Sequence, residues 1–175
     1  LERESFVGVL SGPLLQFDFN SRQSTGLVDS LGINVTKYGK WFDIDQGQGI
    51  DDLKGDILPE AICGALMLVK CEIIDTLLKT DGYIFNEIFF MYKEDVDLSL
   101  RIKKLGYKML VHHDLIAYHC RGWNNSRRAM PFLAKKLSAI NDVRVALNHR
   151  WINLPFAVLK LLYVYCFEYP LQKLS

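Results

Sequence analysis

The sequence predicts an α/β fold, because strand patterns and amphipathic helix patterns follow one another along the chain. Residues 61–69 form a short, continuously apolar run, which favours a buried strand. Residues 70–79 place apolar side chains on one helix face, and residues 95–105 carry a second helical pattern. Residues 107–111 have the pattern of another short strand. A length of 175 residues suits one domain with a single core.

Both predicted helices carry signals at their ends. Asp81-Gly82 follows the first helix, and Gly106 follows the second, where a glycine C-cap is common. Asp95 and Asp97 lie at the start of the second helix and lysines lie near its end, as the helix dipole prefers. We therefore expect the second helix to begin at an acidic cluster.

The N-terminal third is less regular. Residues 6–10 predict a strand that ends at Ser11-Gly12-Pro13, and residues 115–118 predict another short strand. Residues 18–56 are rich in Gly, Asp, Asn, Ser and Gln and show little periodicity. They predict a long loop region with at most a short hairpin, and loops of that length are usually functional or mobile.

The C-terminal part is helical in pattern from Arg127 onward, with Ser126 or Asn125 as candidate caps. Residues 151–169 are mostly apolar, although a strict membrane-spanning helix needs about 20 apolar residues without polar breaks. We expect a helix that lies in the membrane plane with aromatic side chains as interface anchors: Trp151, Tyr163, Tyr165 and Tyr169. The alternative is a buried helix or a contact with another protein part.

The net charge of +1 hides an asymmetry. Residues 1–100 carry 8 Lys and Arg against 17 Asp and Glu, whereas residues 101–175 carry 13 against 3. The basic part suits phosphates, nucleic acid or an anionic membrane. Alternatively, the two parts attract each other inside one fold. The four cysteines form no C-x-x-C pair, which predicts a reducing compartment and no disulfide framework.

Four acidic residues cluster around the start of the second helix: Glu87, Glu94, Asp95 and Asp97. Asp97 and Arg101 are four residues apart and can pair on one helix face. This pairing leaves Glu94 or Asp95 for another partner. A carboxylate behind an aromatic wall suits a general base, because low local polarity raises its pKa toward working pH. The alternative is an ordinary acidic helix N-terminus.

One histidine is a candidate metal ligand. His119 ends a strand-like run, and a neutral imidazole there can complete a metal site with carboxylates from elsewhere. A lone histidine is more often a structural hydrogen-bonding group. The sequence holds no zinc pattern, P-loop, G-x-G-x-x-G or G-x-S-x-G motif.

Several segments together resemble family 2 glycosyltransferases, most closely the rhamnosyltransferase-like branch. In order, they are Cys63–Lys70, Asp81–Phe85, Phe89–Leu98 with its Glu-Asp-x-Asp run, Arg101, and Gly106–Lys108. Matching order and spacing over roughly residues 24–125 make the resemblance specific. It implies that residues 1–125 are the C-terminal, acceptor-side part of a GT-A domain with a Rossmann-like α/β sheet. Residues 126–175 then form a basic and afterwards apolar helical tail.

The resemblance implies inverting transfer of a rhamnose-like sugar from a nucleotide-sugar donor to a glycan or lipid-linked acceptor. Asp95 is then the general base, and Glu94 positions the acceptor or the base. One base suffices, because a diphosphate leaving group needs no general acid, unlike the leaving group in glycoside hydrolysis. The implied substrate-binding residues are Gly64, Ala65, Phe89, Phe90, Tyr92 and Arg101. His119 is the implied ligand of a divalent Mg²⁺ or Mn²⁺ ion.

The chain also departs from the family pattern. Family members begin with a nucleotide-binding strand and helix and an Asp-x-Asp metal signature, and neither precedes Phe6. Asp43 and Asp45 imitate the signature but follow no buried strand pattern. We therefore expect the other metal ligands outside this chain, or a non-catalytic module that binds a membrane or partner. The expected location is cytoplasmic, at the inner face of the cell membrane, and no nucleic-acid reading motif is present.

Overall fold

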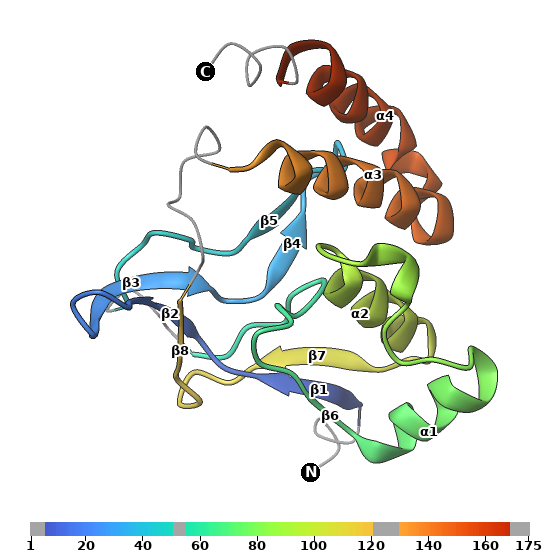
Figure 1. The fold of residues 1–175 in the computed structure, drawn as a ribbon. Coiled ribbons are helices and arrows are strands. Elements are labelled where there is room, and N and C mark those ends of the chain that lie inside the picture. The colour runs from blue at the N-terminus through green and yellow to red at the C-terminus, as the bar shows by residue number, and fades with distance from the viewer. Residues whose placement is uncertain (1–5, 51–54, 121–129, 169–175) are drawn as a thin grey trace.

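A computed structural model describes residues 6–50, 55–120 and 130–168. They form a mixed α/β fold of small sheets with helices (Figure 1). In the first sheet, β1 (Val7–Ser11) lies between β6 (Leu68–Val69) and β7 (Lys108–Val111). β1 pairs antiparallel with β6 and parallel with β7. The strand predictions at residues 6–10 and 107–111 are therefore confirmed.

The main core lies between this sheet and two helices, α1 (Cys71–Thr80) and α2 (Glu94–Lys104). Its buried apolar residues are Val9, Ile62, Ile73, Leu77, Leu98, Ile102, Met109 and Val111. Both helices end within one residue of the predicted position. Gly82 and Gly106 follow them with φ of +82° and +90°, a region that favours glycine. The helix-end signals in the sequence are therefore confirmed.

A second sheet joins β2 (Leu14–Asp18), β3 (Gln23–Ser30) and β8 (Ala117–His119). β2 pairs antiparallel with β3 and parallel with β8, and a separate hairpin joins β4 (Ile33–Val35) to β5 (Trp41–Asp43). Residues 18–56 therefore contain the expected short hairpin, β4–β5, and much irregular chain, but the prediction missed the eight-residue strand β3.

The strand β3 was missed in the sequence because most of its side chains are exposed. The first five residues of β3 are exposed, and only its last three, Val28–Ser30, are buried. A strand that leaves the core in this way has no alternating apolar pattern for sequence reasoning to detect.

Residues 61–69 do not form the predicted continuous strand. Ala61 and Ile62 are buried, and Ala61 forms a bridge with Ile33. The chain then turns at Gly64 and Ala65, and only Leu68–Val69 pair with β1. An apolar run is ambiguous in this respect, because buried turns and strands both need apolar residues.

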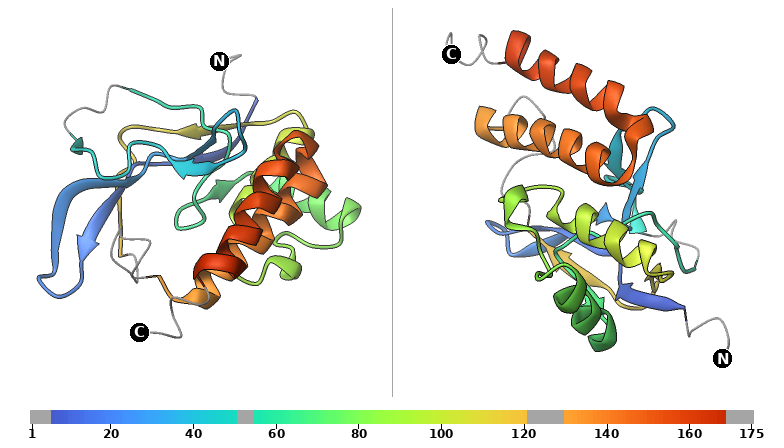
Figure 2. Two further views of the ribbon diagram at one scale, coloured as in Figure 1. Left: turned by 90° about the horizontal axis from the view of Figure 1, so that it is seen from above. Right: turned by 90° about the vertical axis from the view of Figure 1, so that its right-hand side faces the viewer.

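The C-terminal helices form a hairpin of α3 (Phe132–His149) and α4 (Leu154–Tyr163), joined by a 3-10 turn at Trp151–Asn153. A π-helical segment, Val164–Glu168, continues α4. The two long helices lie side by side above α2 (Figure 2). The helix α3 begins after Pro131, whereas the predicted caps, Asn125 and Ser126, lie outside the described residues.

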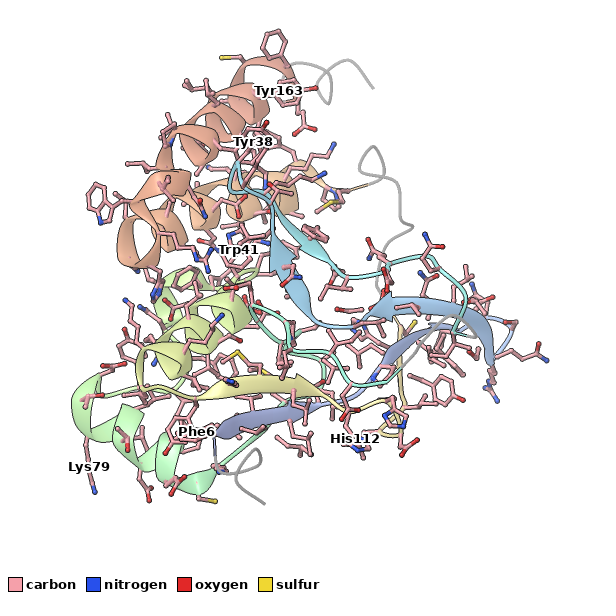
Figure 3. All side chains as sticks on the ribbon, turned by 180° about the vertical axis from the view of Figure 1, so that it is seen from behind. Phe6, Tyr38, Trp41, Lys79, His112 and Tyr163 are labelled. Atoms are coloured by element: carbon pink, nitrogen blue, oxygen red, sulfur yellow. The ribbon has the colours of Figure 1, made fainter. Side chains whose placement is uncertain are left out.

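The helix α3 belongs to the packed domain. Val145 is fully buried in a second core cluster with Ile33, Trp41, Phe89 and Val96. Trp41 lies between the β4–β5 hairpin and the helices (Figure 3). This packing fixes α3 against the N-terminal end of α2, where the predicted catalytic residues lie.

Candidate active site

The carboxylate of Asp95 lies in the first turn of α2, opposite the turn at Gly64. The backbone N–H of Gly64 donates to Oδ2 of Asp95 at 3.0 Å, and the N–H of Val96 donates to Oδ1 at 2.8 Å. A Cβ atom at position 64 would lie 3.3 Å from the Cβ of Asp95. A glycine at position 64 therefore makes room for the side chain of Asp95. Its presence is explained without the predicted approach of a donor sugar to the backbone.

The electrostatic environment favours proton binding at this site. Burial raises the pKa of Asp95, and the nearby Asp43 carboxylate raises it further. The N–H groups of Gly64 and Val96 and the charge of Lys93 oppose this shift without cancelling it. Asp95 therefore holds a proton at higher pH than an ordinary aspartate, as a base must after accepting one.

Glu94 adds a second carboxyl with a raised pKa. Burial is the main cause, and the charge of Asp95 contributes. Among the described residues, its buried Oε2 atom has no hydrogen-bond partner. Burial of an unsatisfied carboxyl oxygen is unfavourable in free energy, so this atom suits a ligand hydroxyl that donates to it.

Sequence reasoning set Asp43 aside, but the fold places it near enough to Asp95 to affect its pKa. Asp43 is the last residue of β5, and its neighbour across the hairpin is Ile33. Only the pairing of β4 with β5 brings this residue to the site. The sequence allowed a short hairpin in residues 18–56, but no local pattern placed it at these residues.

The loop before α2 holds three left-handed residues that are not glycine: Phe90, Tyr92 and Lys93, with φ of 48°, 71° and 68°. Such residues cost of order 1–3 kcal/mol each and cluster at functional sites. Asn141, fully buried on α3, holds this loop in place. Its Nδ2 lies 2.7–2.9 Å from three backbone carbonyl oxygens, those of Phe89, Met91 and Tyr92, which share its two N–H donors. No sequence pattern around Asn141 indicates this role.

The aromatic residues divide into two groups. Phe89 is fully buried in the second core cluster, so its predicted contact with substrate is wrong. Phe90 is 81% exposed, and Tyr92 is partly buried with a pKa raised by burial and by Glu94. Phe90 and Tyr92 can therefore contact a ligand at the start of α2. Ala65 is also exposed, in the turn that faces Asp95.

Arg101 has a structural role. Its Nε donates to Asp97 at 2.9 Å, one terminal nitrogen donates to Asp81 at 3.1 Å, and the other donates to the carbonyl of Ile84. The predicted pair with Asp97 is confirmed. All three guanidinium nitrogens bond to the protein and the residue is buried, so these contacts account for Arg101 without a substrate. His149 from α3 completes the network at 2.7 Å from Asp97.

His119 lies in β8, and its Nδ1 contacts Oδ2 of Asp29 at 2.7 Å. The side chain of Asp29 is fully buried, whereas that of His119 is 34% exposed. When Nδ1–H donates to the carboxylate, Nε2 keeps its lone pair. Metal-binding histidines commonly have this arrangement, so His119 and Asp29 fit a metal ligand with a supporting carboxylate. Within the described residues, His119 belongs to no compact group of three possible ligands.

No protein-family model matches this sequence, and no curated protein matches it significantly. The resemblance to family 2 glycosyltransferases therefore rests on the sequence motifs alone.

Proposed function

We propose that the chain is the acceptor side of an inverting glycosyltransferase and that Asp95 is its general base. The observation that carries this proposal is the Asp95 carboxylate, fixed by two backbone N–H groups while burial raises its pKa. Glu94, with a buried and unsatisfied oxygen, lies beside it. A fixed carboxylate with a raised pKa suits proton abstraction from a sugar hydroxyl.

In the proposed reaction, the acceptor hydroxyl gives its proton to Asp95 while its oxygen attacks the anomeric carbon of the donor. The bond from that carbon to the diphosphate oxygen breaks, and the diphosphate leaves with the electron pair. Attack occurs opposite the leaving group, which inverts the anomeric centre. Glu94 accepts a hydrogen bond from the acceptor, and the exposed Phe90 offers an apolar face to a sugar ring.

The topology is compatible with the proposed GT-A domain. Only three residues separate the end of α2 from the start of β7, so the helix runs antiparallel to that strand. The start of α2, with Asp95, therefore lies toward the carboxyl ends of the parallel strands β1 and β7. Ligands of open α/β sheets bind at that edge.

The proposed donor is a nucleotide sugar, and His119 is the residue of this chain that would hold a Mg²⁺ or Mn²⁺ ion. Such an ion stabilises negative charge on the leaving diphosphate. Asp29 orients the imidazole through Nδ1, so that Nε2 can bind the metal. Carboxylate ligands from a donor-binding part are required in addition, because these ions prefer oxygen ligands.

The direct test is transfer from a panel of nucleotide sugars to glycan acceptors by the chain together with its donor-binding part, with the product anomer assigned by NMR. We expect inversion and a rate that falls as pH decreases. Because burial raises the pKa of Asp95, the acid limb should lie above the ordinary aspartate value of 3.8. Retention of configuration, or a rate unchanged through that range, contradicts the assignment of the base.

A second property, docking to an anionic membrane, is favoured by the surface of α4 and its π-helical continuation. Residues 151–168 have a mean hydropathy of 1.2, and only 17% of them are buried. By length and composition alone, this helical segment could also cross a membrane. Their exposed apolar side chains are Trp151, Ile152, Val158, Leu159, Leu162, Tyr163, Tyr165 and Phe167.

The charge around this surface favours an anionic membrane as its partner. The ammonium group of Lys136 lies 5.7 Å from the centre of the Tyr165 ring, at the edge of the apolar surface. Lys135, its neighbour on α3, is also partly exposed. Each such cation contributes about 1 kcal/mol near an anionic surface. Arg144 and Arg150 contribute less, because they bond to the carbonyl of Ile88 and to Glu60.

Vesicle co-sedimentation tests this docking. We expect the chain to bind phosphatidylserine vesicles more strongly than phosphatidylcholine vesicles, and added salt to weaken the difference. The double variant Ile152→Glu/Leu159→Glu should lose binding, because both side chains are largely exposed and apolar. Phe19→Glu is the matched control, since Phe19 is 72% exposed at the distant β2–β3 turn. Equal binding by the double variant contradicts this surface.

A further inference from the structure

A second group of possible metal ligands lies away from the Asp95 site. Asp56, His112 and His113 each offer one ligand atom, and these atoms all lie within 4.8 Å of one another. The two histidines directly follow β7, and His112 lies at the end of the first sheet (Figure 3). Asp56 comes from a segment more than 50 residues earlier in the chain.

The backbone holds these two segments together before any ligand binds. Ile57 and Val111 form a bridge with N–H···O distances of 3.0 and 2.9 Å, which places Asp56 beside His112 and His113. The N–H of His112 also donates to the carbonyl of Ser11 in β1 at 2.9 Å. The strands β1 and β7 therefore hold the backbone of these three residues in place. Little conformational entropy is lost when an ion binds.

The side chains are also close and partly oriented. The backbone N–H of His113 donates to Oδ1 of Asp56 at 3.1 Å, and Nδ1 of the same histidine lies 2.7 Å from that oxygen. The rings of His112 and His113 stack with centroids 4.9 Å apart and 14° between their planes. Asp114 lies 3.3 Å from Nε2 of His113, so a further carboxylate is at hand as a ligand or as a supporting group.

We propose that Asp56, His112 and His113 form a binding site for a divalent transition metal, with Zn²⁺ as the expected ion. Two imidazole nitrogens and one carboxylate oxygen are the ligands that Zn²⁺ accepts, whereas Mg²⁺ and Ca²⁺ prefer oxygen alone. Three protein ligands leave a fourth position for water or a substrate atom. The bound ion would lie between Asp56 and His113 in place of their direct contact. It would thereby hold residues 55–57 against the end of β7.

Calorimetric titration of the chelator-treated chain with Zn²⁺ tests the site. We expect one saturable equivalent, and at least tenfold weaker binding in each of His112→Ala, His113→Ala and Asp56→Asn. The control is His119→Gln, which removes the histidine of the proposed transferase site and should bind Zn²⁺ as the unchanged chain does. Wild-type affinity in His112→Ala and His113→Ala overturns the proposal.

Two further measurements separate this site from zinc binding at cysteines and from misfolding of the variants. Cys71, Cys120 and Cys166 are exposed, and thiolates also bind zinc, so the titration is repeated after these thiols are alkylated. Loss of the binding on alkylation overturns the proposal. Melting in chelator shows whether the variants fold, because substitution of two exposed side chains and the partly exposed His112 should leave the midpoint nearly unchanged. Added Zn²⁺ should then raise the melting temperature of the unchanged chain and of His119→Gln, but not that of the three site variants.

Discussion

Asp95→Asn is expected to lower glycosyl transfer by roughly 100- to 10,000-fold, the usual contribution of a general base. The amide is nearly the same size as the carboxylate, and its oxygen can still accept the N–H of Gly64. It cannot accept the hydroxyl proton of an acceptor. The geometry of the turn at Gly64 is therefore retained while the proton-accepting function is lost.

The stability of this variant separates a catalytic role from a structural one. Burial raises the pKa of Asp95 in the folded chain, so its ionised form destabilises the fold above that pKa. The penalty disappears as pH falls through the raised pKa. Asp95→Asn removes the penalty at neutral pH but keeps an acceptor for only one of the two N–H groups, so its melting temperature should stay close to that of the unchanged chain. A lower melting temperature indicates that the carboxylate is needed for the fold.

The measurement is initial rate under saturating donor and acceptor, together with thermal melting at neutral and acidic pH. Asp75→Asn provides a matched control, because Asp75 is an exposed aspartate on α1, away from the start of α2. It should leave the rate unchanged. Full activity in Asp95→Asn contradicts the proposed base, and Glu94 is then the next candidate.

Local sequence signals predicted the second half of the fold well. The helices α1 and α2 end at Thr80 and Lys104, just before Gly82 and Gly106, as their capping patterns indicate, and the strand β7 follows α2 closely. The Asp97–Arg101 contact was also predictable, because residues four apart on a helix are neighbours. These features depend on residues that are close in sequence.

The features that sequence reasoning missed depend on contacts between distant segments. Asp43 approaches Asp95 only through the β4–β5 hairpin, and Asn141 reaches the loop before α2 only because α3 folds back. Phe89 is an aromatic residue beside exposed Phe90, and only packing in a cluster with residues distant in sequence, such as Ile33 and Val145, places it in the core. Residue type and spacing contain no information about these long-range contacts.

The second large effect is expected for Arg101→Ala, with a loss of roughly 3–5 kcal/mol in the free energy of unfolding. The substitution leaves the buried carboxylate of Asp97 without one of its two bonded partners. It also removes the links from α2 to Asp81 and to the carbonyl of Ile84. The melting temperature should fall by about 2–4 °C per kcal/mol for a chain of this size.

The control for this variant is Lys103→Ala on the same helix. Lys103 pairs with Glu60 at 2.8 Å, but both side chains are about one-third exposed, so its loss should cost less than about 1 kcal/mol. Equal effects of the two substitutions contradict a special role for the buried network. Chemical denaturation of both variants at neutral pH measures the difference.

The pH dependence of Arg101→Ala provides an independent check. Burial raises the pKa of Asp97, but the hydrogen bonds from His149 and Arg101 outweigh it, so the net shift is downward. The ionised carboxylate therefore stabilises the folded chain above the unfolded pKa, and this stabilisation is lost as pH falls through the folded pKa. Without Arg101 the folded pKa of Asp97 rises, and acid unfolding should begin at higher pH. An unchanged acid midpoint contradicts the pairing as the source of stability.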